Sequence, residues 1–496
     1  MRYIIKTMLC LCMLVVLCCC GGRKKVVRSQ ADLPGSRIGV QLGTVADTKA
    51  SAMEHDKEGT QVERFTKTAD AIQALMQGKV DCVIEDELPA RAFVAQNDGL
   101  ALLPQAFSKD DYAFCVSRDR QSLARQINHA LRLLANDGTL DSIRRRHVQG
   151  GMGVAYQPKA IGRPNGRLVV ATNATFKPYE YYQDGRIVGI DIDIMQAVAD
   201  VLGMTLQVED MNFDAVLTSV QTGKADVGAS ALTVTPDRRK NVCFTQCYAQ
   251  SKQVIIVPVA AHRQAAQSLG QKFRQDFLVD GRYLYLLQGL GNTLIITFFA
   301  ILISLFLGSL IAIVRTTHDR TGRYVVANAL CKLFLVVIRG TPTMVQLLII
   351  YYVIFAAADV SKVFVAVVAF GINSSAYLAE VVRSGIMSVD RGQLEAGRSL
   401  GLSYGQTLRH VILPQAFKNV LPAIGNELIT LLKETSISGY IGLMDLTKGS
   451  DIIRSITYDA MLPLGIVALI YLAIVLTLSS AVGALEKKLR SNERIR

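Results

Sequence analysis

The chain contains four long stretches without a single charged residue, and these stretches limit the folds that are open to it. They cover residues 283–314, 340–358, 363–379 and 460–485. Each is close to or above the roughly 20 residues that an α-helix needs to cross a bilayer. A fifth apolar segment, 420–442, contains Glu427, Lys433 and Glu434 and is expected to face protein or water, because lipid excludes charges. The sequence therefore predicts an all-α membrane domain of five transmembrane helices over residues 283–490.

Composition and charge support a membrane protein. Half of the residues are hydrophobic, the mean hydropathy is +0.29 and the formal net charge is +13. A basic excess also suits nucleic-acid binding, but only 7% of the residues are aromatic and the charges flank the apolar runs, so no nucleic acid partner is expected. The basic residues gather in segments 315–332, 383–418 and 487–496. Because basic loops stay in the cytoplasm, we expect a cytoplasmic C-terminus and an extracytoplasmic position for the residues before about 283.

The N-terminus has the pattern of a targeting segment. Arg2 and Lys6 precede an apolar run at 8–17, which ends at three consecutive cysteines, 18–20. This pattern predicts a signal peptide or membrane anchor in residues 1–21, and it leaves open whether one of the cysteines is lipidated. Farther along the chain, Cys243 and Cys247 are expected to stay unpaired, because an extended segment holds them too far apart for a disulfide.

Residues 33–258 alternate β-rich and helical patterns, which is typical of parallel sheets covered by helices. The expected strands are 37–43, 61–65, 80–86, 167–172, 205–210 and 225–230. Two such series, together with a Gly-Lys-x-Asp phrase that occurs at 78–81 and again at 223–226, indicate two similar lobes. The expected boundaries are lobe-forming parts at 33–147 and 167–258 and linkers at 148–166 and 259–282.

Polar and aromatic residues follow the expected strands, at the ends where such sheets bind ligands. A free amino acid needs donors for its carboxylate, a carboxylate for its ammonium group and an apolar surface for its side chain. Arg238 offers the donors, Asp86 the carboxylate and Phe176 the apolar surface. Each residue taken singly also has an ordinary structural explanation: a solvated surface charge for Arg238, a strand-end cap for Asp86 and core packing for Phe176. Gly43 and Thr44 stand at the start of a predicted helix, where their backbone N–H groups can bind an anion. The candidate ligand-binding residues are Gly43, Thr44, Asp86, Asn173, Phe176, Phe213, Ser230, Thr233 and Arg238.

Longer segments resemble the polar amino acid-binding proteins of ABC importers. The first lobe of that family is similar to FKPYEYYQDGRIVGIDIDIMQAVADVLG (176–203) and SALTVTPDRRKNVCF (230–244). Its second lobe and closing helix are similar to LPGSRIGVQLGT (33–44), DAIQALMQGKVDCVIED (70–86) and NHALRLLANDGTLDSIRRRH (128–147). The family has the first lobe first, so this chain is interpreted as a circular permutant, with two truncated domains as the alternative. In the permuted order, only the strand near 111–117 is expected to join the lobes.

The resemblance implies roles for the candidate residues. Arg238, in the phrase TPDR, matches the arginine that binds the α-carboxylate of the ligand, and Thr233 matches the hydroxyl that assists it. Asp86 matches the aspartate that binds the ammonium group.

The resemblance also implies a pocket for the ligand side chain. Phe176 and Phe213 match residues that line it. Asn173 stands where many relatives selective for cationic or amide side chains carry Asp, which argues against a strong preference for Arg or Lys.

The membrane half resembles the permease subunit of the same importers. The similarity includes GNTLIITFFAILISLFLG (291–308), IRGTPTMVQLL (338–348) and the docking-loop pattern in EAGRSLGLSYGQTLRHVILP (395–414). The last segment is predicted to form two short helices that meet at Gly401, and in the family this hairpin docks in a groove of the ATPase subunit. Glu395 and Ala396 match the docking pattern as well, whereas Gly397 replaces an alanine.

The expected fold is an α/β two-lobed periplasmic-binding-protein-like domain of type II, followed by an all-α membrane domain of five transmembrane helices like a type I ABC importer permease. The implied function is amino acid uptake across the bacterial plasma membrane, in which the lobes capture a free polar amino acid and deliver it to the fused permease. The implied partners are a second permease copy, as a homodimer, and two copies of a separate ABC ATPase subunit.

No cofactor, metal site or catalytic residue is expected on this chain. The sequence has no Gly-x₄-Gly-Lys-Ser/Thr phosphate-binding loop, so ATP and Mg are expected on the partner ATPase and the chain is not expected to be an enzyme. A ligand-gated channel or sensor also uses amino-acid-binding lobes, but its pore helices interrupt the lobes, whereas here both lobes precede all the apolar runs. A periplasmic enzyme of this fold lacks support, because no histidine stands near the proposed pocket.

Overall fold

The computed structural model describes residues 25–54, 56–97, 99–148, 156–259, 268–356, 358, 360–457 and 459–491. The predicted signal peptide or membrane anchor, residues 1–21, lies outside the described residues. The chain divides into two compact units. One, here called lobe A, contains residues 25–110 and 250–259; the other contains residues 111–249, here called lobe B, and residues 268–491, here called the helical domain.

Lobe A is built on a sheet with strand order β2-β1-β3-β14-β4, and β5 pairs with β14. Its first three strands run parallel, as the alternating pattern predicts, and β14 runs antiparallel to β3 and β4. Apolar side chains from these strands, such as Ile38, Ile84 and Ile255, are buried in the core. The strands are β1 (Arg37–Gln41), β2 (Gln61–Phe65), β3 (Cys82–Asp86), β4 (Leu100–Leu102), β5 (Ser108–Tyr112) and β14 (Ala249–Pro258). The helices are η1 (Gln30–Asp32), α2 (Val45–Ser51), α3 (Thr68–Met76) and α4 (Glu87–Gln96).

Lobe B is built on a sheet with strand order β11-β7-β12-β6-β13. A small antiparallel sheet, β10-β9-β8, follows β7 in the sequence. β7 pairs in parallel with β11 and β12, as expected, and β6 runs antiparallel to β12 and β13. The strands are β6 (Cys115–Ser117), β7 (Arg167–Thr172), β8 (Thr175–Phe176), β9 (Glu180–Gln183), β10 (Arg186–Val188), β11 (Thr205–Asp210), β12 (Val227–Gly228) and β13 (Val242–Phe244). The helices are η2 (Arg118–Arg120), α5 (Gln121–Asn136), α6 (Thr139–Val148), α7 (Ile190–Leu202), α8 (Phe213–Gln221) and α9 (Pro236–Arg239).

Three features of the lobes differ from the expectation. The expected strand 225–230 is reduced to β12, two residues long. The expected closing helix is two helices, α5 and α6, and both pack on α7 of lobe B. The chain also passes between the lobes twice, at 110–111 and at 249–250, because the buried strand β14 completes the sheet of lobe A. The prediction of a single connection near 111–117 was therefore wrong.

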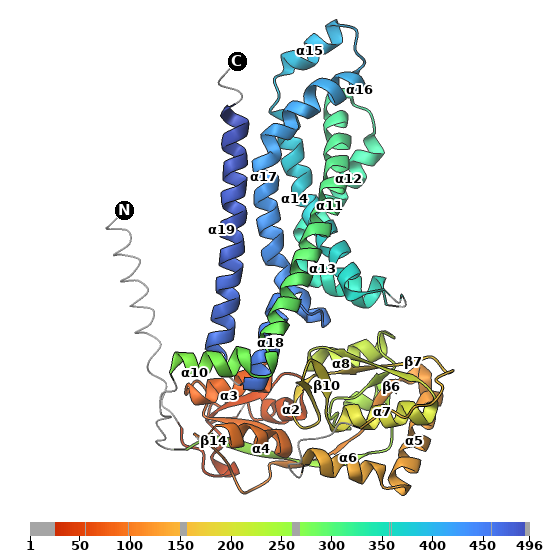
Figure 1. Ribbon diagram of the computed structural model, residues 1–496, viewed down its shortest axis with the longest axis vertical. Helices are drawn as coiled ribbons and strands as arrows, with labels where there is room; N and C mark the ends of the chain where they lie inside the picture. Colours follow the sequence, from red (N-terminus) through yellow and green to blue (C-terminus); the bar gives the residue numbers. More distant parts are fainter. Residues whose placement is uncertain are drawn as a thin grey trace. The chain divides into compact units, whose positions relative to one another are not determined.

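Among its described residues, the helical domain contains three helices long and apolar enough to cross a membrane by length and composition: α11 (Tyr283–Thr321), α14 (Lys362–Met387) and α19 (Met461–Ser491). α14 packs against α11 and α17, and 72% of its most apolar stretch is buried, so it forms the centre of the bundle (Figure 1). The other elements are α10 (Leu269–Phe273), η3 (Arg274–Leu278), η4 (Val279–Gly281), α12 (Val325–Gly340), α13 (Thr343–Ile349), η5 (Ile350–Ile354), α15 (Arg391–Ser399), α16 (Tyr404–Thr407), η6 (Leu408–Ile412), α17 (Leu413–Glu434), η7 (Thr435–Ile441) and α18 (Leu446–Thr457).

The predicted second span, 340–358, is not a single helix. α12 begins at Val325, inside the segment taken for a basic loop, and it meets the α13–η5 segment at a bend of 107°. Pro342 lies at the bend, and a proline cannot donate the backbone hydrogen bond that would continue α12. The two pieces together count as one span at most, which brings the number of candidate spans in the described residues to three or four.

Candidate ligand-binding residues and docking hairpin

Arg238 lies in a short helix of lobe B, close to two other predicted residues. α9 follows Thr235, whose hydroxyl accepts a hydrogen bond from the Arg238 N–H at 3.2 Å. The guanidinium Nη1 of Arg238 donates to the carbonyl of Thr233 at 2.8 Å, and its Cζ lies 5.5 Å from the centre of the Phe213 ring. The carbonyl contact and the cation–π contact hold the guanidinium in one place, as binding of a carboxylate requires.

Buried hydrogen bonds hold the loop that follows β7. The Ser230 hydroxyl donates to Glu180 at 2.8 Å and accepts from the Asn173 N–H at 3.3 Å. The side-chain amide of Asn173 donates to the carbonyl of Met211 and accepts from the Thr175 hydroxyl, both at 2.8 Å. Asn173 is 1% exposed and Ser230 is 2% exposed. These contacts give both residues a supporting role, and their contact with a ligand stays a prediction.

The two predicted pocket aromatics keep part of their surface exposed. Phe176 lies in β8 and stacks on Tyr179 with ring centres 5.9 Å apart. Tyr179 in turn meets Tyr112 edge to face at 5.3 Å. Phe213 is the first residue of α8, beside the Arg238 guanidinium. Partly exposed rings fixed by their neighbours are suited to contact an apolar ligand stem.

A buried carboxyl that sequence analysis missed shapes the segment that leads to Thr233. Asp191, at the start of α7, accepts hydrogen bonds from the Ala231 N–H at 2.8 Å and from the Tyr248 hydroxyl at 2.5 Å. Burial raises the pKa of Asp191 to about 7. Ala231 has a φ of +43°, which a non-glycine residue adopts only when its surroundings hold it. In the sequence, Asp191 looked like an ordinary acidic residue at a helix start, and no signal separated it from Asp193.

Lobe A contains Asp86, the predicted ammonium-binding residue. Asp86 is the last residue of β3, is partly buried and immediately precedes α4. Its N–H donates to the neighbouring Glu85 at 2.8 Å, and burial raises the pKa of Glu85 to about 7. The position at a strand end agrees with the prediction, whereas the ammonium contact itself stays a prediction.

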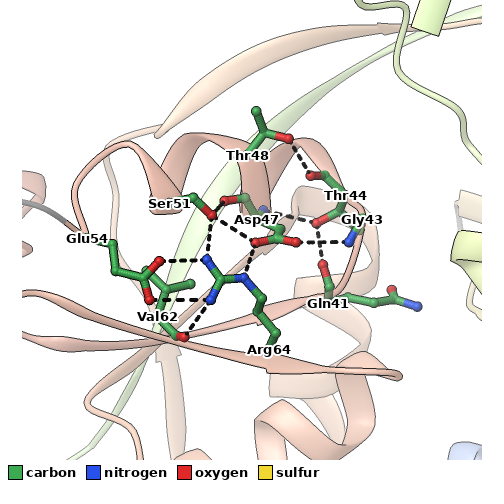
Figure 2. Close-up of polar contacts among 9 residues, drawn as sticks. All are labelled: Gln41, Gly43, Thr44, Asp47, Thr48, Ser51, Glu54, Val62 and Arg64. Carbon is green, nitrogen blue, oxygen red and sulfur yellow. Dashed lines mark hydrogen bonds and ion pairs between the residues drawn. The ribbon is translucent and has the colours of Figure 1, made fainter. Parts of the chain in front are cut away.

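An internal carboxylate occupies the predicted anion-binding turn of lobe A (Figure 2). Asp47 accepts a hydrogen bond from the Gly43 N–H at 3.0 Å, and its own N–H donates to the Thr44 hydroxyl at 3.2 Å. Arg64 pairs with Asp47 at 2.9 Å and with Glu54 at 2.7 Å. The negative charge at the start of α2 is therefore supplied by the chain itself, through Asp47. Contact of Gly43 and Thr44 with a ligand stays a prediction.

Residues 395–414 form helices that meet at a glycine turn, as the sequence predicts. α15 ends before Gly401, which has a φ of +87°, and α16 begins after Ser403. A Cβ at Gly397 would lie 2.5 Å from the Thr407 methyl group, so the glycine that replaces an alanine lets α15 and α16 pack closely.

The outer surface of this hairpin carries the residues that match the docking pattern. Glu395 and Ala396 are exposed, and Leu400 beside the turn is 83% exposed. A large apolar side chain with so much exposed surface on a polar hairpin suits a partner surface. Leu400 was missed because one leucine between polar residues gives no periodic pattern.

Comparison with known proteins gives matches to both halves of the chain. Residues 168–439 match the family described as "Bacterial extracellular solute-binding proteins, family 3". The "Arginine transport system permease protein ArtQ" of Bacillus subtilis (strain 168) is 38% identical over 211 residues, which cover 42% of this chain and 94% of that protein. The "Glutamine transport system permease protein GlnP" of Escherichia coli (strain K12) is 36% identical over 208 residues, 41% of this chain and 93% of that protein.

Solved structures include one with similar sequence. The "Crystal structure of an amino acid ABC transporter with histidines" is 41% identical, covers 43% of this chain and 98% of that chain, and superposes with a TM-score of 0.39.

Proposed function

Because the chain belongs to family 3 of the bacterial extracellular solute-binding proteins and to the ABC transporter permeases, we propose that it takes up a polar amino acid across the bacterial plasma membrane, driven by a separate ATPase. The matched relatives are described as arginine and glutamine transport permeases, which supports an amino acid as the substrate class. The extracytoplasmic lobes capture the amino acid, and the fused helical domain carries it inward. A channel or sensor is not favoured, because the matched relatives are transport permeases.

One observation carries the ligand-binding part of this proposal: lobe B brings Arg238, Thr233 and Phe213 together. The guanidinium is held by the Thr233 carbonyl and lies over the Phe213 ring. In the proposal, Arg238 binds the α-carboxylate, Thr233 assists it, and Phe213 and Phe176 contact the side chain. Asp86 of lobe A is proposed to accept from the ammonium group.

Equilibrium binding of each of the twenty common L-amino acids to the full chain in lipid nanodiscs tests the proposal. We expect Arg238→Ala to lose roughly 2–5 kcal/mol of binding free energy, hence at least about thirtyfold in affinity. Arg239→Ala is the matched control, since Arg239 is the exposed neighbour in the same helix. Failure of every amino acid to bind would refute the substrate class. Equal affinities of the two variants would refute only the role of Arg238.

The proposal includes five membrane crossings. α11, α14 and α19 supply three, and α12 with α13 and η5 supplies a broken fourth. We propose α17 as the fifth, because it is 22 residues long and packs against α14 and α19. Its Glu427 accepts a hydrogen bond from the Ser374 hydroxyl of α14 at 2.9 Å, which keeps this carboxylate away from lipid. Five crossings place the α15–α16 hairpin and the C-terminus in the cytoplasm when the lobes are outside.

The proposed cytoplasmic partner is an ABC ATPase subunit, which docks on the α15–α16 hairpin. Exposed Glu395, Ala396 and Leu400 support this assignment. We further propose a homodimer of this chain with two ATPase copies, which supply ATP and Mg. Mass measurement of the intact complex purified in detergent tests this stoichiometry.

A further inference from the structure

Asp210, the last residue of β11, contacts both the ligand-binding loop of lobe B and the helical domain. Its Oδ1 accepts a hydrogen bond from the Ala174 N–H at 2.9 Å, directly after Asn173 in the loop that follows β7. Its Oδ2 pairs with the Nζ of Lys448, in α18, at 2.8 Å. The side chains of Asp210 and Lys448 are only 4% and 5% exposed, so the ion pair is almost completely removed from water.

The loop and the end of β11 are joined by further contacts. The Met211 N–H donates to the carbonyl of Thr172 at 2.9 Å, and the Asn173 side chain donates to the carbonyl of Met211 at 2.8 Å. A displacement of Asp210 therefore moves the backbone of residues 172–174 with it.

Lys448 is held equally firmly on the side of the helical domain. Its N–H donates to Asp445 at 2.7 Å, and the Asp445 carboxylate also accepts from the Ser438 hydroxyl and the Gly439 N–H, both at 2.8 Å. Burial alone would lower the pKa of Lys448, but the nearby carboxylates, Asp210 first among them, outweigh it and raise this pKa, so the side chain is charged. A charged lysine on a fixed turn is a rigid anchor for Asp210.

α18 is in turn packed against the first membrane span. The Leu446 N–H donates to the Thr293 hydroxyl of α11 at 3.2 Å, and the Asn292 side chain donates to the carbonyl of Met444 at 2.8 Å. A Cβ at Gly449 would lie 2.6 Å from the Tyr285 carbonyl oxygen, so the two helices touch along their backbones. The path from the ligand-binding loop to α11 thus runs through Asp210, Lys448 and α18.

We propose that Asp210 is a positioning residue that couples the 173–176 loop of lobe B to α18 of the helical domain. The inference rests on the proposed function, because it takes the 173–176 loop as part of the ligand site. A ligand that shifts this loop alters the ion pair between Asp210 and Lys448. The resulting displacement of α18 is transmitted to α11, against which α18 packs.

A neighbouring ion pair provides a matched control. Glu209, the residue before Asp210, pairs with Lys362 of α14 at 2.5 Å, and its other oxygen accepts from Gln207 at 2.8 Å. This pair also joins lobe B to the helical domain, but the polar contacts of Glu209 just described lie on its own strand and on α14. If each pair only attached lobe B to the helical domain, removing either pair would change residues 173–176 in the same way. If Asp210 couples these residues to α18, only removal of the Asp210 pair would change them.

Hydrogen exchange of the full chain in lipid nanodiscs, without any ligand, tests the proposal directly. The double variant Asp210→Asn/Lys448→Met removes both charges of the ion pair together, and its new asparagine still offers an oxygen to Ala174. We expect exchange in residues 173–176 to become at least about tenfold faster, because the acceptor is no longer anchored on α18. The control Glu209→Gln/Lys362→Met is expected to stay within about twofold of the parent chain. Unchanged exchange in the first variant, or equal acceleration in both, would overturn the proposal.

A second readout separates this inference from the proposed function. The chain is reconstituted with its ATPase, and the rate of ATP hydrolysis is measured with and without a mixture of the twenty L-amino acids. We expect the Asp210 double variant to lose most of the stimulated rate and the Glu209 double variant to keep it. If the parent chain is not stimulated, the proposed function fails, while hydrogen exchange still decides whether Asp210 couples the loop to α18. The single variant Lys448→Arg keeps the positive charge, and its hydrogen exchange in residues 173–176 is expected to stay close to that of the parent chain.

Discussion

A methyl group at Gly442 should force the end of β11 away from the helical domain. Gly442 has a φ of +67°, and a Cβ at this position would collide with the carbonyl oxygen of Asp210 and lie 2.9 Å from the Nζ of Lys362. Lys362 bridges the same place, because its Nζ donates to the Gly442 carbonyl at 3.2 Å and pairs with Glu209 at 2.5 Å. The backbone of one side must therefore move to admit an alanine.

Two separate effects lower the free energy of unfolding of the Gly442→Ala variant. The left-handed conformation costs an L-residue about 1–2 kcal/mol, and overpacking costs about 1–3 kcal/mol, so the expected loss of stability is about 2–5 kcal/mol. Gly322→Ala isolates the first cost, since Gly322 has a φ of +69° and nothing within 4 Å of its Cβ position. Gly439→Ala isolates the methyl group, since its nearest contact is at 3.6 Å and its φ is not positive, and we expect a change below about 1 kcal/mol.

Calorimetric melting of the full chain in nanodiscs measures these differences, because the chain has no tryptophan to follow by fluorescence. The expected order of melting temperature is Gly442→Ala lowest, Gly322→Ala next, and Gly439→Ala close to the parent. Equal melting of Gly442→Ala and Gly322→Ala would show that the close approach to Asp210 costs nothing, which would refute the reasoning.

Three further predictions address the hairpin, the buried carboxyl and the helix packing. Gly401→Trp and Glu395→Arg should keep amino acid binding but abolish ligand-stimulated ATP hydrolysis by the assembled complex; stimulation that persists in both would exclude the hairpin as the docking site. Burial raises the pKa of Asp191 to about 7, above the roughly 3.9 of an unfolded chain, so the native state holds the proton more tightly and stability should fall as pH rises from about 4 to 7. The melting temperature of Asp191→Asn should lack this part of the decline, and identical pH profiles would contradict the assignment. Gly289→Ala, whose Cβ would lie 2.6 Å from the Asp445 carbonyl carbon, should lower the melting temperature, while Gly291→Ala, in open space on the same helix, should not.

Much of the fold could be predicted from local patterns in the sequence. The parallel strands β1, β2, β3, β7 and β11 lie where the β-rich segments predicted them, because each is a short run bounded by a turn and a helix. Gly401 likewise marks the hairpin turn, since a φ of +87° favours glycine. The bend at Pro342 and the return of β14 to lobe A depend on packing between distant segments, and no local pattern reports such packing.

The candidate site shows the same division. Arg238 and Thr233 were predicted because they follow a strand in a recognisable phrase, and the structure brings them together; their contact with a ligand stays a prediction. The supporting residues were not found, because Asp191 and Asp210 act through partners distant in sequence: Tyr248 for Asp191, and Lys448 for Asp210. The sequence around a single acidic residue does not indicate which distant residue it will contact in the folded chain.

The covalent attachment of the lobes to the helical domain changes the order of the transport reaction. A receptor that diffuses freely must meet its permease in a second-order step, and uptake then depends on how much receptor the cell makes. Here both lobes are part of the same chain as the membrane helices, so every carrier molecule has its own receptor and that encounter is removed. The rate of uptake per carrier should therefore stay constant when expression of the chain is raised or lowered, and only the number of carriers should set the total flux.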